Sequence, residues 1–378
     1  MTKPRYITHL DQVPQLTPSE RELLAPVVEK YAFRTNDYYQ SLIRWDDPQD
    51  PIRRIIMPDV MEEMEWGELD VSHEEDYTVA PGCQHKYRDT AVLLCNDVCG
   101  GYCRFCFRKR IFMDDNDEAV RDVSPGLEYI SRHLEISNVL LSGGDPLLMS
   151  TRKLEGIISR LRGIGHVKII RIGTKIPAFN PFRITGDPAL LEMIARFSTP
   201  RRRIYIMAHF NHPRELTDAA VEALDLLHRA GAEICNQTPL IRKVNDDPAV
   251  LGRLFKKLSF IGVPPYYVFQ CRPTEGNLTY AVPVEKSIDI LDRARRNCSG
   301  LAKRARLTMS HHTGKIEVLA TDDRFVYFKY LRAANPADLE RFFAYRRNAD
   351  AYWLDDYEEF AAEREFTDLR DGFTTERR

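Results

Sequence analysis

Short apolar runs alternate with longer amphipathic stretches through the middle of the chain, from Ala91 onward. The apolar runs have the length of buried strands, and they lie at 91–95, 138–144, 167–174, 204–211, 233–240 and 265–271. Helices are expected around 154–161, 189–197, 218–230, 249–258 and 284–296, with start signals at Pro188 and at Thr217 or Asp218. This alternation predicts a parallel sheet with right-handed crossovers, curled into a full or partial β/α barrel.

The two flanks of this alternation have other patterns. Residues 1–85 predict a helical N-terminal extension, with a helix around 19–31, and residues 86–303 are expected to form the barrel core. Residues 304–378 predict a C-terminal extension: a hairpin of RLTMS and KIEVLA, a third strand at 324–330 and a charged helical tail beyond Ala334. The expected fold class is therefore α/β, a partial barrel of six β/α units with a helical N-terminal and a small C-terminal extension.

The residues with evident chemistry fall where the predicted strands end. The motifs CGGYCRFC, SGGDP, RIGTK, HFNHP, NQTP and QCRP follow the six strands in that order. Barrel enzymes build their active sites from the loops at the carboxyl ends of the strands. The sequence therefore predicts one active site at that end of the barrel.

The first of these motifs spaces three cysteines as C-x3-C-x2-C, at Cys99, Cys103 and Cys106. Three thiolates can hold three corners of a [4Fe–4S] cluster and leave the fourth iron open for chemistry. A structural zinc knuckle is the minor alternative. The spacing resembles that of the radical S-adenosylmethionine (SAM) enzymes. Arg104, Arg108 and Lys109 suit an anionic cluster or a solvated loop face, and we favour a functional role for Arg108.

Composition and charge limit the kinds of molecule and the cellular compartment that we expect for this protein. The chain has 378 residues and a formal net charge of −2, which gives no global field to attract nucleic acid or anionic lipid. The N-terminus lacks an apolar signal segment and no apolar run is long enough to cross a bilayer, so we expect a cytoplasmic protein. Four of the eight cysteines lie within twelve residues, which favours metal binding over a disulfide framework.

The SGGD element contributes Gly143, Gly144 and Asp145 at the end of the second predicted strand. A glycine pair exposes backbone groups, and a carboxylate can accept from an ammonium group. Alone this signal is weak. One strand after the cysteine motif, it resembles the radical SAM element that holds the methionine amino group of SAM.

Longer phrases resemble lysine 2,3-aminomutase and its relatives, in the family's order and over roughly residues 25–315. They are DPIRR (50–54), CGGYCRFCFRKR (99–110), NVLLSGGDPLL (138–148), RIGTKIP (171–177), HFNHPRELT (209–217), NQTPLIRKVND (236–246) and PPYYVFQC (264–271). The resemblance implies a partial (β/α)6-type radical SAM barrel. It also implies that Cys99, Cys103 and Cys106 ligate the cluster, and that Gly143, Gly144, Asp145, His209 and Gln237 hold SAM.

The same resemblance implies pyridoxal 5′-phosphate (PLP) on Lys315, which follows the turn HHTG. Lys86 stands where the family has one phosphate-binding cation, but Thr90 stands where it has an arginine. The implied reaction moves an amino group from Cα to Cβ after a 5′-deoxyadenosyl radical removes a β-hydrogen. The cofactors do the chemistry while the protein positions them. Lys315 and Arg108 are the candidate catalytic residues.

The resemblance implies that the substrate is a small molecule, an amino acid, and two arginines are candidates to bind it. Arg108 matches the family arginine that pairs with the substrate carboxylate. Arg272 stands where lysine aminomutases have an aspartate for the distant ammonium, and the aspartate that the family places before the PLP lysine is also absent here. Two nearby buried cations repel by several kcal/mol at an effective dielectric of about 20. An acidic or neutral substrate side chain is therefore favoured over lysine, unless Arg272 turns outward.

Two other functions stay open from the sequence. One keeps the cluster and SAM but lacks PLP, and acts on a small molecule or a peptide. The other is a non-catalytic iron–sulfur or zinc-stabilised protein, which Cys83 or Cys95 as an extra ligand would support. The favoured aminomutase also needs an electron donor of the flavodoxin or ferredoxin type. Nucleic acid and membrane partners are not expected, and assembly as a homo-oligomer stays open.

Overall fold

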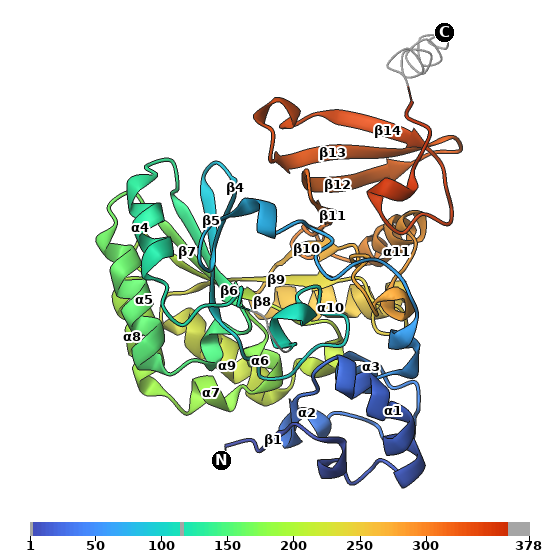
Figure 1. Ribbon diagram of the computed structural model, residues 1–378, viewed down its shortest axis with the longest axis horizontal. Helices are drawn as coiled ribbons and strands as arrows, with labels where there is room; N and C mark the ends of the chain where they lie inside the picture. Colours follow the sequence, from blue (N-terminus) through green and yellow to red (C-terminus); the bar gives the residue numbers. More distant parts are fainter. Residues whose placement is uncertain (1–2, 114–116, 362–378) are drawn as a thin grey trace.

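The computed structural model describes residues 3–113 and 117–361 and has a long curled sheet at its centre (Figure 1). Seven neighbouring strands of this sheet are parallel. They are β5 (Thr90–Asn96), β6 (Asn138–Gly143), β7 (Ile169–Thr174), β8 (Ile204–Ala208), β9 (Glu233–Pro239), β10 (Pro265–Phe269) and β11 (Arg306–His311). The predicted α/β fold class, a partial barrel, is confirmed.

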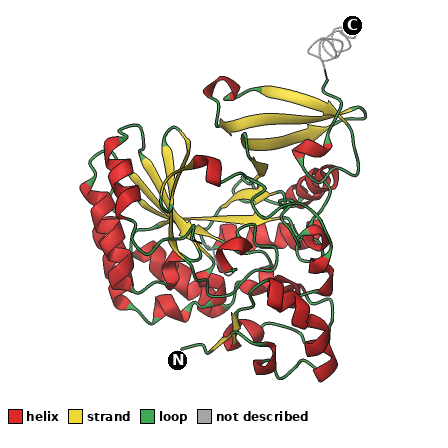
Figure 2. Cartoon of the chain, viewed as in Figure 1, coloured by secondary structure: helices red, strands yellow, loops and turns green. Residues whose placement is uncertain are grey.

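Helices cover the outer face of the parallel strands, and Figure 2 shows this red layer around the yellow sheet. The crossover helices are α4 (Ser124–Arg132), α5 (Thr151–Gly163), α8 (Pro188–Phe197), α9 (Asp218–Arg229), α10 (Pro248–Phe260) and α11 (Val284–Arg296). Thr217 caps α9 and Asp187 caps α8, which starts at Pro188, as the start signals predict. The sequence pattern missed α4.

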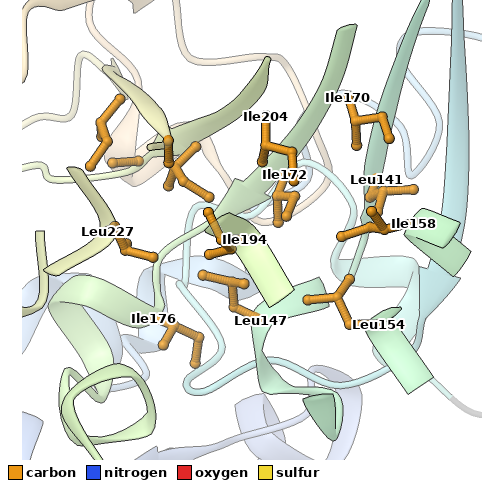
Figure 3. Close-up of a cluster of buried hydrophobic side chains, with 14 of the residues drawn as sticks. Leu141, Leu147, Leu154, Ile158, Ile170, Ile172, Ile176, Ile194, Ile204 and Leu227 are labelled. Atoms are coloured by element: carbon orange, nitrogen blue, oxygen red, sulfur yellow. The ribbon is translucent and has the colours of Figure 1, made fainter. Parts of the chain in front are cut away.

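Alternate strand residues face the helices and pack into one core, shown in Figure 3. Ile170 and Ile172 of β7 are fully buried there. Arg171 lies between them and is only partly buried, so the strand alternation directs it to the opposite face, the inside of the barrel. This two-residue period divides every strand into a helix-facing side and a lumen-facing side. The lumen-facing side is where polar and charged side chains gather.

The sheet extends past the barrel at both edges. On one edge β4 (Cys83–Tyr87) and β3 (Thr78–Ala80) join β5 antiparallel, so residue 86 lies inside a strand. On the other edge β12 (Gly314–Thr321), β13 (Phe325–Ala333) and β14 (Phe342–Arg346) follow antiparallel to β11. The predicted C-terminal hairpin is therefore not separate from the barrel, because its first strand pairs in parallel with β10.

The prediction of helix beyond Ala334 is wrong for the described part of that segment. Residues 336–356 form two short 3-10 helices and the strand β14. The aromatic run FFAYR prefers a pleated surface, and it completes the sheet by pairing with β13. The expected tail at 362–378 lies outside the described residues.

The N-terminal residues form short helices that pack below the barrel, at the lower right of Figure 1. They include α1 (Pro18–Lys30), where a helix was predicted, α2 (Asp37–Gln40) and α3 (Pro51–Ile56). A small antiparallel pair of β1 (Tyr6–Ile7) and β2 (Thr35–Asn36) lies among them. None of the helices among the described residues is both long and apolar enough to cross a bilayer.

Replacing Leu141 by alanine tests the helix-facing core. Leu141 is 0% exposed, so Leu141→Ala should lower the free energy of unfolding by about 2–5 kcal/mol. Leu134, 74% exposed, provides the control, and Leu134→Ala should change stability by no more than about 0.5 kcal/mol. Urea unfolding followed by circular dichroism measures both, and equal effects would contradict this packing.

Candidate active site

The SGGD element holds the root of the cysteine loop. The amide of Gly144 donates to the Asn96 carbonyl at 2.6 Å, and the amide of Asp145 donates to Val98 at 2.9 Å. Gly143 has a φ of 105°, and a Cβ at Gly144 would lie 2.5 Å from the Val98 oxygen. Both positions therefore need glycine for the fold of this turn, independently of any ligand.

Asp145 is buried, and its carboxylate joins the ends of β6 and β7. Its oxygens accept from the Thr174 hydroxyl at 2.7 Å, the Lys175 amide at 2.7 Å and the Leu147 amide at 3.0 Å. Burial raises the pKa of Asp145 to about 6, against the lowering effect of these donors. The described contacts give Asp145 a positioning role, and direct contact with SAM stays a prediction.

The three cysteines of the loop lie near one another. Burial is the largest cause that raises the pKa of Cys99 and Cys103, and the neighbouring Cys106 thiolate raises both further. Gly100 and Gly101 let the loop pack tightly, since a Cβ at either would lie within about 3 Å of Ile176 or Ile56. Close thiolates repel unless a metal neutralises them, so this donor set suits a metal cluster.

The other two candidate ligands are elsewhere. Cys83 and Cys95 are both buried in the helix-facing hydrophobic core. The Cys95 thiol donates to the Ser142 carbonyl at 3.7 Å. Both thiols are therefore placed in the core and not beside the cysteine loop as a fourth ligand, and ligation of a cluster by Cys99, Cys103 and Cys106 stays a prediction.

The basic residues of the loop have different surroundings. Arg104 is buried and forms a salt bridge with Glu62 at 2.8 Å, so it anchors the loop to the N-terminal extension. The ammonium of Lys109 is also buried, but it has no hydrogen-bond partner among the described residues. It lies 4.4 Å from the Tyr31 ring, in a small pocket that Cys103 and Cys106 also line. A buried cation without a partner beside these thiols fits an anionic cluster.

A cavity of about 130 Å³ lies inside the barrel and is lined by most of the remaining candidate residues. Its cations are Lys86, Arg108, Arg272 and Lys315, and its hydroxyl-bearing residues are Ser72, Tyr77, Tyr87, Thr90 and Ser310. Glu74 is the carboxylate among the lining residues. The sequence-predicted PLP and substrate residues are therefore brought together, although they come from four separate segments.

Glu74 forms a bidentate ion pair with Arg108. The Arg108 Nε and Nη2 atoms donate to the Glu74 carboxylate at 2.9 and 2.8 Å, and its Nη1 donates to the Ser142 hydroxyl at 2.9 Å. Arg110 Nη2 also donates to Glu74 at 2.8 Å. Burial acts to raise the pKa of Glu74, but Arg108, with Arg272 and Arg110, holds it well below its usual range. This carboxylate is committed to the arginines.

Lys315 extends from β12 into the cavity beside two aromatic rings. Its Nζ atom lies 4.5 Å from the Tyr267 ring centroid and 4.6 Å from that of Phe269, and it has no carboxylate partner among the described residues. Burial, with the charges of Arg171 and Arg272, lowers the pKa of Lys315 to about 7. A large fraction of this amine is neutral near pH 7, which makes it a nucleophile for carbonyl groups.

His209 and Gln237 lie outside the lining of this cavity. His209 follows β8, where its ring is 6.4 Å from that of Phe105 in the cysteine loop, and burial lowers its pKa well below the usual value. Gln237 pairs in register with Tyr267 on β10. It lies within β9 and is partly buried. Their predicted contact with SAM stays a prediction.

Sequence reasoning missed two charged groups of this site. Glu74 lies in a loop of the N-terminal extension, and no local pattern indicated that it reaches the barrel. Arg171 lies in the middle of an apolar strand, and its Nε donates to Asn138 at 2.9 Å. A charge in such a strand is a usable signal, because it must face either solvent or the lumen.

Comparison with known proteins found no matching family model. A protein of Aquifex aeolicus (strain VF5), provisionally named L-lysine 2,3-aminomutase, is 54% identical over 96% of this chain and 97% of its own length. The L-lysine 2,3-aminomutase of Fusobacterium nucleatum is 38% identical over 78% of this chain and 69% of its length. The glutamate 2,3-aminomutase of Clostridioides difficile (strain 630) is 34% identical over 78% and 68%.

The lowered pKa of Lys315 predicts a pH-dependent stability. Between about pH 7 and 10 the Lys315 amine is protonated in the unfolded chain but largely neutral in the folded one, so in cofactor-free protein Lys315 contributes a stability that rises with pH. Lys86, whose pKa is also lowered to about 7 by burial, acts in the same direction. The buried thiols, whose pKa values are raised, oppose this contribution above about pH 8.5.

Lys315→Met should therefore reduce this rise, as measured by thermal midpoints from pH 7 to 10. Lys303 is exposed, and Lys303→Met should leave the rise unchanged. A Lys315→Met profile parallel to that of the wild type would contradict a buried, largely neutral Lys315.

Proposed function

The chain belongs to the lysine 2,3-aminomutase family of radical SAM isomerases, and from that premise we propose that it is a PLP-dependent 2,3-aminomutase whose substrate is not lysine. The family uses a [4Fe–4S] cluster, SAM and PLP. Family membership also makes the chain an enzyme, so the non-catalytic iron–sulfur interpretation is set aside. The PLP dependence and the substrate class belong to this proposal.

The orientation of Arg272 carries the substrate part of the proposal. Its guanidinium lines the cavity, 3.6 Å from the Phe107 ring centroid, with Nη1 donating to the Ser72 hydroxyl at 2.5 Å. The outward orientation that would allow lysine is thus absent. A lysine ammonium here would meet Arg272, and the carboxylate of Glu74 is already paired with two arginines. Substrates with an acidic or neutral side chain avoid this repulsion.

Cys99, Cys103 and Cys106 are proposed to hold the cluster, which with SAM supplies the 5′-deoxyadenosyl radical. The Lys109 ammonium offsets the negative charge of the cluster in a region from which water is largely excluded. Gly143, Gly144 and Asp145 fix the loop root, while His209 and Gln237 offer polar groups toward SAM. An external electron donor of the flavodoxin or ferredoxin type completes this part of the proposal.

Lys315 is proposed to hold PLP, which when bound allows the amino nitrogen to migrate between carbons. Three features of the chain support this role: a neutral amine near pH 7, aromatic rings beside it and nearby cations for a phosphate. Tyr267 and Phe269 limit the directions in which the Lys315 side chain can move. Lys86 contributes a phosphate-binding cation from β4.

Arg108 is proposed to bind the substrate carboxylate. Glu74 occupies the guanidinium fork that such a carboxylate would take. Substrate binding therefore replaces Glu74 by the substrate carboxylate on Arg108. Glu74 keeps its ion pair with Arg110, so it stays neutralised by a cation throughout. Arg272 lies close enough to receive a second acidic group of the substrate.

The proposed function is tested first by cofactor content. Anaerobically reconstituted protein should bind PLP with the absorbance of a lysine-bound form, and Lys315→Ala should lose that band but keep the iron–sulfur absorbance. Cys103→Ala should abolish formation of 5′-deoxyadenosine from SAM under reducing conditions. Lys303→Ala is the matched control. Wild-type protein with an intact cluster and no PLP binding would contradict the aminomutase assignment and favour a radical SAM enzyme without PLP.

Reversing the charge at Arg272 tests the substrate class. In an anaerobic screen of amino acids for β-amino acid products, the wild type should act on acidic or neutral substrates rather than lysine. Arg272→Asp should raise the kcat/KM ratio of lysine to the wild-type substrate by about tenfold or more. Arg272→Gln, which removes the charge without reversing it, should give an intermediate ratio. A ratio that is the same in all three proteins would contradict a role for Arg272 in specificity.

A further inference from the structure

Arg332 lies directly opposite Lys315 on neighbouring antiparallel strands. In the register of β12 and β13, Lys315 pairs with Arg332 and Gly314 pairs with Ala333. Residues directly opposite in such a pair have Cβ atoms about 4.5–5.5 Å apart and share one face of the sheet. A Cβ at Gly314 would lie 2.3 Å from the Arg332 carbonyl oxygen, so the glycine permits this close pairing. Arg332 is thus on the same face as Lys315.

The guanidinium of Arg332 reaches the border of the cavity. It packs 4.5 Å from the ring centroid of Tyr87, and its Nη1 donates to the Thr90 hydroxyl at 3.0 Å. Tyr87 and Thr90 both line the cavity. Its Nη2 forms an ion pair with Asp89, which is on the outer side and 57% exposed. The Thr90 hydroxyl therefore lies between the Arg332 guanidinium and the cavity.

The charges on this side of the cavity suit a phosphate group. Arg332 has five N–H donors, and the contacts with Thr90 and Asp89 use two of them. Lys86 lies on β4, the strand next to that of Thr90, and donates to the His311 carbonyl at 2.6 Å. Glu74, the carboxylate that lines the cavity, is bound to Arg108 and Arg110 instead. The Thr90 hydroxyl accepts from Arg332 and donates to the Asp89 carboxylate at 2.9 Å, so its own proton is already used. The remaining N–H groups of Arg332 and the ammonium of Lys86 are therefore the donors that a phosphate could take.

We propose that Arg332 and Lys86 bind the phosphate of the PLP carried by Lys315, and that Thr90 positions the guanidinium of Arg332. This inference rests on the proposed function, since it requires PLP in the cavity. The cation comes from β13 and reaches the hydroxyl of Thr90, 242 residues away in sequence. Arg332 therefore supplies, from a distant strand, a positive charge that position 90 itself lacks.

The inference is tested by comparing two ligands that differ in the phosphate. Cluster-loaded protein, freed of PLP, is titrated with PLP and with pyridoxal, and binding is followed by absorbance. Arg332→Met should weaken PLP binding about tenfold to a hundredfold, the loss typical of a charge-assisted contact, and change pyridoxal binding by less than about twofold. Asp89→Asn, which removes the ion pair and keeps the cation, should retain PLP affinity within about threefold.

Two further variants test whether the positive charge itself is what binds PLP. Arg332→Lys, which keeps the charge without the fork, should bind PLP with intermediate affinity, and it serves if Arg332→Met does not fold. Thr90→Arg combined with Arg332→Met should regain most of the lost PLP affinity, because it returns a guanidinium to the same place.

Two results would overturn the inference alone: unchanged PLP affinity in the Arg332 variants, or equal losses for PLP and pyridoxal. Both require that the wild type binds PLP through Lys315. A wild type that binds neither ligand would instead overturn the proposed function, and the inference with it.

Discussion

The carboxylate of Glu74 joins the N-terminal extension to the basic residues that follow the cysteine loop. It receives the fork of Arg108 and one nitrogen of Arg110, and it is the negative charge that lines a cavity of four cations. Removing one partner of such a buried pair typically costs about 3–5 kcal/mol, because a charge is left without compensation. This contact fixes the N-terminal extension over the barrel, orients Arg108, and limits how much more positive charge the cavity can accept.

The cysteine loop is held by contacts of a different kind, mostly through the backbone. The glycine pair at the end of β6 approaches residues 96–98 so closely that no side chain would fit. Asp145 then links that turn to the end of β7 through buried hydrogen bonds. Motifs that look like separate ligand sites in the sequence therefore form one connected structure. The buried carboxylate of Asp145 is stable there because its hydrogen-bond donors are held in place. Lys109 is the exception, with a buried ammonium that suits the charge of a cluster.

The excess of cations inside the barrel links cofactor binding to substrate choice. Burial, together with repulsion from Arg272, lowers the pKa of Lys315 and of Lys86 to about 7, which keeps the Lys315 amine partly neutral near pH 7. The same excess disfavours a second ammonium on the substrate and favours anionic groups, either a phosphate or a carboxylate. Arg332, which contacts the lining residues Thr90 and Tyr87, adds a further positive charge beside this cavity.

Local patterns in the sequence determined the parallel strands and most of their helices, the cysteine spacing and the strand-end position of the motifs, because these depend on residues within a few turns of one another. Only the tertiary structure decided which side chains the charged residues contact. Arg108 meets Glu74 across 34 residues, Arg104 meets Glu62 across 42, and Arg332 meets Thr90 across 242. It also placed β11 beside β10, and turned a segment expected to be helical into β14. Hydrophobic periodicity specifies which face of a strand is buried, but the charge that will stand opposite depends on which distant segment packs there.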